Sequence, residues 1–166
     1  MQLFAWTHAG GIPAPAAFNL TATRTADATA ANNTLAADAQ LSLQIPQIGK
    51  YTLEVFLPYY EATLGTGGFQ FDLNSGTATI AGIVYGVHGF NTAAFANAGV
   101  TAVTSATAAA TIATSASAPS WLLAKGWVNV TAIGTFAVRW AQNTTDGTHP
   151  TTLKAGAYFT LATKLA

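Results

Sequence analysis

Few side chains in this sequence can act as acids, bases or metal ligands at neutral pH: there are three histidines and six carboxylates. The imidazoles belong to His8, His88 and His149, and none stands at metal-ligand spacing from another imidazole or from a carboxylate. His149 lies in a loop before Pro150 and is expected to be a solvated turn residue. His88 is expected to bond to backbone at a strand end. The sequence therefore predicts no metal site.

Glycoside cleavage needs paired carboxylates, and the candidates are Glu54, Glu61 and Asp72. Glu54 lies within an expected strand and Glu61 follows it, so the sequence leaves their separation open. We expect these carboxylates to be structural partners of Arg139 or Lys50. No Gly-x-Ser-x-Gly elbow, phosphate-binding loop or dinucleotide fingerprint occurs. The sequence thus predicts no catalytic residue and no cofactor, and we do not expect an enzyme.

Aromatic side chains are the other candidates for function, because their rings stack on sugars and pack at protein interfaces. Trp127 and Trp140 fall on expected strands, where a core position is favoured. Tyr59 and Tyr60 follow Pro58 at a strand end. They are the best candidates for an exposed contact, and a subunit interface is favoured over carbohydrate.

The composition of the chain excludes several partners. Only 7% of the residues are charged, six basic residues balance six acidic ones, and there is no cysteine. Nucleic acid requires a basic stripe and an anionic membrane a polybasic patch, so neither partner is expected. Thr, Ser, Gly and Asn interrupt the uncharged stretch 73–124, which therefore does not predict a membrane span. So little charge favours a surface covered by neighbouring chains, with an unusually apolar monomer as the alternative.

Alternation of apolar and polar residues predicts the elements that position these side chains. Strands are expected over residues 18–23, 41–45, 51–57, 69–73, 77–90, 136–140 and 157–165. The last two are expected to form a β-hairpin around a long polar loop, with the final strand central in its sheet. Residues 25–39 are expected to be loop, with room for one short strand. The stretch 91–120 has no helical apolar stripe and is also assigned to strand.

Many short strands with turn signals between them predict an all-β fold, a jelly-roll-like antiparallel β-sandwich. Residues 16–166 are expected to form this single domain. Residues 1–15 form a separate segment, in which Gly10 to Pro15 favours an extended chain. We expect this segment to be an N-terminal arm that docks elsewhere, with a first strand on the domain's own sheet as the alternative.

Several blocks of the sequence carry a resemblance. They are residues 34–43 (TLAADAQLSL), 49–57 (GKYTLEVFL), 139–144 (RWAQNT) and 153–159 (LKAGAYF). In their order and spacing these blocks resemble a structural module of tailed-bacteriophage virion proteins, of the capsid-decoration and tail-fibre type. The resemblance implies a virion setting, a trimeric jelly-roll-like fold and a turn shaped by Asp38. Residues 81–120 depart from the pattern.

The resemblance and the low charge together predict a non-enzymatic structural protein. We expect a homotrimer that decorates the outer surface of a phage particle, made in the bacterial host cytoplasm, which stabilises the shell by binding major capsid proteins. The alternative is a receptor-binding or tail-fibre head domain that contacts host glycans. The residues expected to bind capsid or a neighbouring subunit are Leu3, Phe4, Trp6, Ile12, Tyr59, Tyr60 and Trp121.

Overall fold

The computed structural model describes residues 19–61, 67–74, 76–91, 96–103, 110–112 and 120–163, and these residues contain strands and no helix. In chain order the strands are β1 (Asn19–Thr23), β2 (Ala28–Ala30), β3 (Ala36–Ile45), β4 (Gly49–Glu61), β5 (Phe69–Asn74), β6 (Thr79–Asn91), β7 (Ala96–Val103), β8 (Ala110–Ile112), β9 (Ser120–Ala132), β10 (Gly134–Ala141), β11 (Thr151–Leu153) and β12 (Tyr158–Thr163).

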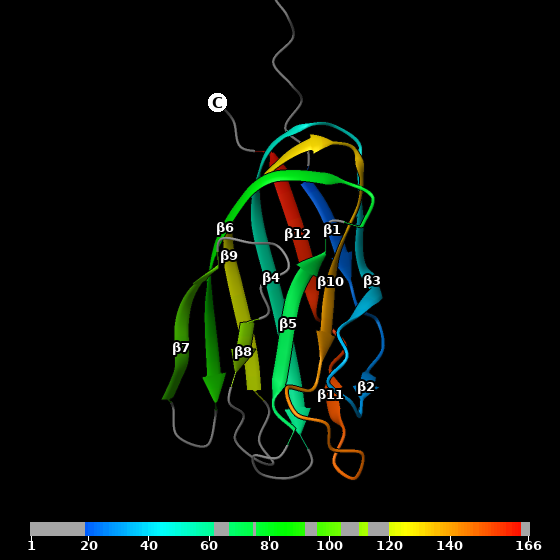
Figure 1. Cartoon of the computed structure of the whole chain (residues 1–166), viewed down its shortest axis with the longest axis vertical. Helices are drawn as coiled ribbons and strands as arrows, with labels where there is room; N and C mark the ends of the chain where they lie inside the picture. Colours follow the sequence, from blue (N-terminus) through cyan, green and yellow to red (C-terminus); the bar gives the residue numbers. More distant parts are fainter. Residues whose placement is uncertain are drawn as a thin grey trace, which may run out of the picture.

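The strands form two antiparallel sheets that pack face to face (Figure 1). Sheet A has the order β1-β12-β4-β9-β6-β7, and the short β11 and β2 extend it beside β4. Sheet B has the order β3-β10-β5-β8. An antiparallel sandwich of this kind buries the inner faces of both sheets and leaves two outer faces.

Ten of the strands pair in a nested way. β1 pairs with β12, β2 with β11, β3 with β10, β4 with β9, and β5 with β8. The first strand pairs with the last, the second with the last but one, and so on inwards, which is how a long hairpin rolls into a jelly roll. The hairpin of β6 and β7 is inserted between β5 and β8 and extends sheet A beyond β9. The predicted jelly-roll-like antiparallel sandwich is confirmed.

Aromatic pairs join the two sheets along the length of the core. Phe136 on β10 meets Phe159 on β12 edge to face, with ring centroids 5.4 Å apart. The other pairs across the sheets are Tyr59 with Phe69 at 4.6 Å, and Phe71 with Tyr85 at 6.3 Å. All six of these side chains are at most 1% exposed. Such ring pairs add about 0.5–1.5 kcal/mol each beyond the burial of their area.

The predicted C-terminal hairpin is wrong. β10 lies in sheet B between β3 and β5, whereas β12 lies in sheet A between β1 and β4. The polar loop after β10 therefore crosses from one sheet to the other and adds β11 on the way. The alternating pattern identified both strands correctly, but it shows only which side chains face a core. It does not distinguish a neighbour in the same sheet from a strand across the sandwich.

Two further expectations about the strands had mixed outcomes. The stretch assigned to strand over residues 91–120 contains β7 and β8 within the described residues, as predicted. Residues 25–39, expected to be loop with room for one short strand, hold the short strand β2 and also the beginning of β3. These strands are hard to see in the sequence because β2 has only three residues, and its core-facing residues, Ala28 and Ala30, are small and only partly buried.

Close packing of β9 against β6 depends on Gly126. A Cβ atom at this position would lie 2.0 Å from the carbonyl oxygen of Val84 and 2.5 Å from the Cα of Tyr85, both backbone atoms. We expect Gly126→Ala to lower the free energy of unfolding by about 3 kcal/mol, because overpacking against backbone cannot relax by side-chain rotation. Urea denaturation measures this change.

The matched control is Gly86→Ala on the facing strand, where an added Cβ meets nothing within 4 Å. That substitution should leave the stability unchanged or raise it slightly, since it restricts only the unfolded chain. Equal stability of the two variants would contradict the packing described for β9 and β6.

Candidate functional site

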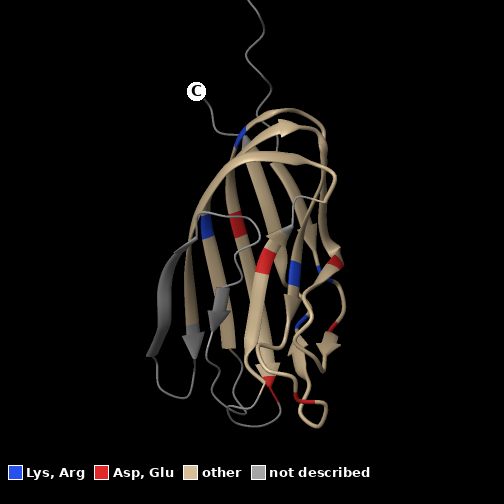
Figure 2. Ribbon diagram, viewed as in Figure 1, with Lys and Arg blue, Asp and Glu red and all other residues tan. Residues whose placement is uncertain are grey.

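The two outer faces of the sandwich differ in chemistry. On sheet B the outward side chains are polar or small: Gln44 on β3, Thr135 on β10 and the Arg139–Asp72 pair are polar, and Ala137 and Ala141 on β10 are small. Figure 2 shows that the charged residues are isolated bands on both sheets and form no patch. The outer face of sheet A is instead rich in aromatic and aliphatic side chains. It is the candidate interaction surface.

Four half-buried side chains form the centre of that face, and we call them the aromatic row. They are Phe56 on β4, Trp121 and Leu123 on β9, and Tyr158 on β12. They meet because Phe56 is in register with both Tyr158 and Leu123, while Trp121 is in register with the next outward residue of β4. The ring of Phe56 stacks on Tyr158 at 5.5 Å and is tilted towards Trp121 at 6.2 Å.

Two more apolar side chains continue this face towards β6. Val84 is 37% exposed and Trp127 is 38% exposed, and the two are in register. The Trp127 ring lies over Gly82, 3.6 Å from the place where a Cβ of that residue would be. The expected core position of Trp127 is therefore wrong, because Val128 occupies the inward position beside it. The core position expected for Trp140 is confirmed, at 7% exposure.

An internally neutralised charge pair lies beside the aromatic row. Lys125 Nζ is 3.0 Å from Glu54 Oε2, and the Tyr158 hydroxyl donates a hydrogen bond to Glu54 Oε1. The Tyr158 hydroxyl first, and then Lys125, hold the pKa of Glu54 below its usual value. The same bond raises the pKa of Tyr158. Next to the pair is an open hollow of about 390 Å³, whose lining includes Thr52 and Thr160. The face therefore has no net charge at its centre.

The predicted contact residues have different positions. Tyr59 is 1% exposed and packs in the core, so its predicted exposure is wrong, and burial raises its pKa to about 12. The inward positions of β4 are the odd-numbered ones, and Tyr59 continues that series beyond Pro58. Tyr60 and Trp121 lie half-buried on the outer face of sheet A. The four residues of the predicted arm, Leu3, Phe4, Trp6 and Ile12, lie outside the described residues.

Sequence reasoning missed three members of the aromatic row, Phe56, Leu123 and Tyr158. The alternation that predicted β4 already placed Phe56 on the same face as Glu54. The available signal for this surface was an aromatic residue on the outward face of a strand. Such a residue indicates an interaction surface only when the side chains beside it on the neighbouring strands are known, and these depend on the register.

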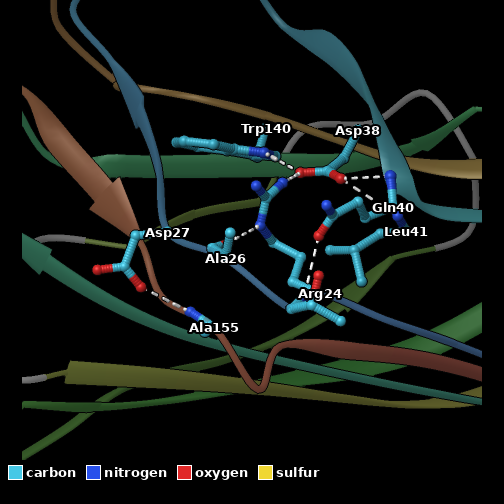
Figure 3. Close-up of polar contacts among 9 residues, drawn as sticks. Arg24, Ala26, Asp27, Asp38, Gln40, Leu41, Trp140 and Ala155 are labelled. Carbon is cyan, nitrogen blue, oxygen red and sulfur yellow. Dashed lines mark hydrogen bonds and ion pairs between the residues drawn. The ribbon is translucent and has the colours of Figure 1, made fainter.

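A buried polar cluster lies between the two sheets, where the end of β1 meets β3 and β10 (Figure 3). Asp38 accepts hydrogen bonds from the backbone amides of Gln40 and Leu41 at 2.9 and 3.2 Å, as expected of an Asx side chain. The expected turn is wrong, because Asp38 lies within β3, where the pairing with β10 shifts register. Its other oxygen accepts from Trp140 Nε1 at 2.9 Å and pairs with Arg24. Both charged side chains are at least nine-tenths buried. The cluster therefore ties three strands together through one carboxylate.

The other carboxylates are also engaged within the fold. Arg139 Nε donates to Asp72 at 2.8 Å, as predicted for that arginine, and Lys154 pairs with Asp27. The Thr151 hydroxyl donates to the buried Glu61 at 3.1 Å. In the loop after β10, Asp146 lies 3.0 Å from the Nδ1 atom of His149. Together with Glu54 and Asp38, these contacts involve all six acidic residues of the chain.

Two other kinds of site are absent from the described residues. No group of three or more His, Cys, Asp or Glu side chains could hold a metal ion there. In the same part of the chain no helix is long and apolar enough to cross a membrane.

Comparisons with known proteins find similarity to viral structures. No family model matches the chain, and no curated protein matches it. A structure of infectious bursal disease virus, Gx strain, is similar at 14% identity with a TM-score of 0.30, over 98% of this chain and 44% of that one. The VP2 subviral particle of infectious bursal disease virus is similar at 11% identity with a TM-score of 0.24, over the same shares. This chain thus spans less than half the length of those proteins, and likenesses of this strength carry no argument about function.

The engagement of Asp38 leads to a prediction about its role. Asp38→Asn should lower the free energy of unfolding by about 3 kcal/mol, because Arg24 would be left buried without its counter-charge. Thermal or urea unfolding measures the loss. Asp27→Asn is the control, since the Asp27 and Lys154 side chains are both nearly half exposed and their separation should leave stability almost unchanged. If Asp38→Asn unfolds like the wild type, the cluster does not hold the three strands together.

Proposed function

We propose that this chain is a non-enzymatic structural protein of a virion, and that it assembles through the outer face of sheet A. The finer proposal is a homotrimer that decorates the outer surface of a phage particle and stabilises the shell by binding major capsid proteins. The single observation that carries the proposal is the contrast between the aromatic outer face of sheet A and the polar outer face of sheet B.

An aromatic outer face of this kind supports assembly for a physical reason. Interfaces are enriched in Trp, Tyr and Phe at their centres, where full desolvation gives these side chains most of the binding energy. Phe56, Trp121 and Tyr158 are already held in contact by their strands, so little side-chain entropy would be lost when a partner covers them. Each Å² of apolar area removed from water contributes about 25 cal/mol, as an upper estimate.

The charges support a binding role without chemistry. A general acid or base needs a titratable group that can reach a substrate, but Asp38, Asp72 and Glu61 are buried and hydrogen-bonded within the fold. The basic residues are too few and too well paired to follow a phosphate backbone. A neutral aromatic surface is suited to another protein.

The tip of the sandwich supplies a second apolar surface. Ile48 lies in the turn between β3 and β4 and is 66% exposed, and Ile133 lies between β9 and β10 and is 58% exposed. The two turns are neighbours, because Gly49 is in register with Val130 and Gly134 with Ile45. We assign the contact with major capsid proteins to this tip, which leaves the face of sheet A for neighbouring copies.

The proposal predicts the mass of the protein in solution. The full chain should behave as a trimer of about 51 kDa, three times the 17.0 kDa of one chain, in light scattering coupled to size exclusion. Phe56→Ser should shift this mass towards the monomer, because it removes the ring at the centre of the aromatic row. Gln44→Ser, on the outer face of sheet B, is the control and should leave the mass at the trimer value. A wild-type chain that stays monomeric at high concentration would contradict the proposal.

The alternative, a receptor-binding domain that contacts host glycans, has one observation in its favour. An open hollow of about 470 Å³ beside the Asp38 cluster is lined by polar side chains that include Asn32, Thr34 and Gln40. Sugar hydroxyls bind to such groups, although the aromatic residue of this hollow, Trp140, is buried and offers no ring face for stacking.

Location on the particle distinguishes the two functions. Gold-labelled antibody against this chain should mark the whole shell of purified virions in electron micrographs if the protein decorates the capsid. Label confined to the tail, together with glycan-array binding that is lost in Asn32→Ala and Gln40→Ala, would favour the receptor-binding function instead.

A further inference from the structure

A histidine stands at the β6 end of the aromatic row. Phe56 on β4 is in register with Tyr158 on one side and with Leu123 on the other. Leu123 is in turn in register with His88 on β6. Val87 is buried and His88 is exposed, so the imidazole lies on the outer face of sheet A. His88 therefore extends the aromatic row by one strand.

Few charged groups surround this imidazole. β7 pairs with β6 on its other side, and the stretch 73–124, which includes β6 and β7, contains no Asp, Glu, Lys or Arg. On β9, Lys125 is in register with Gly86, the next outward position of β6. Such a diagonal neighbour lies about 7–8 Å away in an antiparallel sheet. The charge that β9 places beside His88 is thus positive, and it opposes a second positive charge.

The carboxylates of the chain are already engaged, so none is free to pair with a protonated His88. On this face Glu54 pairs with Lys125 at 3.0 Å and accepts a hydrogen bond from the Tyr158 hydroxyl. These two contacts, that from Tyr158 first, hold the pKa of Glu54 below its usual value, so the pair stays ionised when a histidine titrates. The other five acidic side chains have partners within the fold as well. A second copy brings the same paired carboxylates.

We propose that His88 makes assembly through the outer face of sheet A sensitive to pH, with copies that associate while the imidazole is neutral and separate when it is protonated. The inference rests on the proposed function, because it needs a second copy to cover this face. A neutral imidazole can be covered together with Leu123 and Phe56. A charged one would lose its water beside these apolar side chains without gaining a counter-charge.

The direction of the pH dependence follows from proton binding. Covering an imidazole with apolar surface favours its neutral form, so the assembled chains bind fewer protons than the separate chains. Association is therefore complete above pH 6.5, the ordinary imidazole pKa being about 6.5, and it is lost as the pH falls below that value. At pH 5.5 the loss is about tenfold at most for each covered His88, which is about a thousandfold in the association constant of a ring of three.

Light scattering of a dilution series at pH 7.5 and at pH 5.5 tests this proposal. The concentration at which half of the trimer has dissociated follows the square root of the association constant, so for the wild type it should rise by about thirtyfold at most. His88→Gln keeps a polar side chain without a charge and should dissociate at the same concentration at both pH values. His149→Gln is the matched control and should keep the wild-type shift, because that imidazole has Asp146 as its partner in the loop after β10.

A permanent charge at position 88 gives a second readout at neutral pH. His88→Lys should dissociate at pH 7.5 at concentrations where the wild type is still a trimer, since the ammonium is strongly hydrated. Circular dichroism of each protein at both pH values shows whether the strands are kept.

The outcomes separate this proposal from the proposed function. A wild-type trimer that dissociates at the same concentration at both pH values would overturn the role of His88 and leave the trimer standing. A pH shift that persists in His88→Gln would overturn it as well, because another group would then be responsible. A wild-type chain that is monomeric at both pH values contradicts the proposed function, and the role of His88 fails with it.

Discussion

The two-residue period of β4 and β9 is the constraint on which the rest of this structure depends. These long strands pair from Gly49 to Tyr59 and lie in the middle of sheet A. One set of alternate residues fills the core, and the other set forms the outer face with its aromatic row. A slip of one residue in either strand would turn Glu54 or Lys125 into the core and expose leucines. The register that fixes the fold therefore also fixes the candidate interaction surface, and neither can change without the other.

The low charge of the chain is consistent with that arrangement. Four ion pairs between basic and acidic side chains use Asp27, Asp38, Glu54 and Asp72, and the remaining two carboxylates bond to Thr151 and His149. Little net field is left outside the protein to steer ligands or to repel another copy. Association would then depend on apolar area and shape, with a weak dependence on salt.

The sequence predicted the type of the elements better than their partners. The alternation at Tyr51 to Leu57 predicted β4. The resemblance implied that the Asp38 side chain bonds to nearby backbone amides, and the structure has that bond, within strand β3 rather than in a turn. The C-terminal hairpin was wrong because two strands that face one core show the same pattern whether they are neighbours or lie in opposite sheets. Tyr59 was misplaced for a related reason: a proline at position 58 suggested that β4 had ended, but the strand continues to Glu61 with its period intact.

The candidate site was harder to predict than the fold, because Phe56, Leu123 and Tyr158 are far apart in the chain and form one surface with Trp121 only through the register of their strands.

The restriction of aromatic residues to one outer face has a consequence for the size of any assembly. A sandwich with two apolar outer faces could stack without limit, because each added copy would present a new apolar surface. Here the polar face of sheet B, with Gln44, Thr135 and the Arg139–Asp72 pair, does not offer such a surface. The same asymmetry that favours association therefore favours a finite assembly, with the Ile48 and Ile133 tip left free for a different protein.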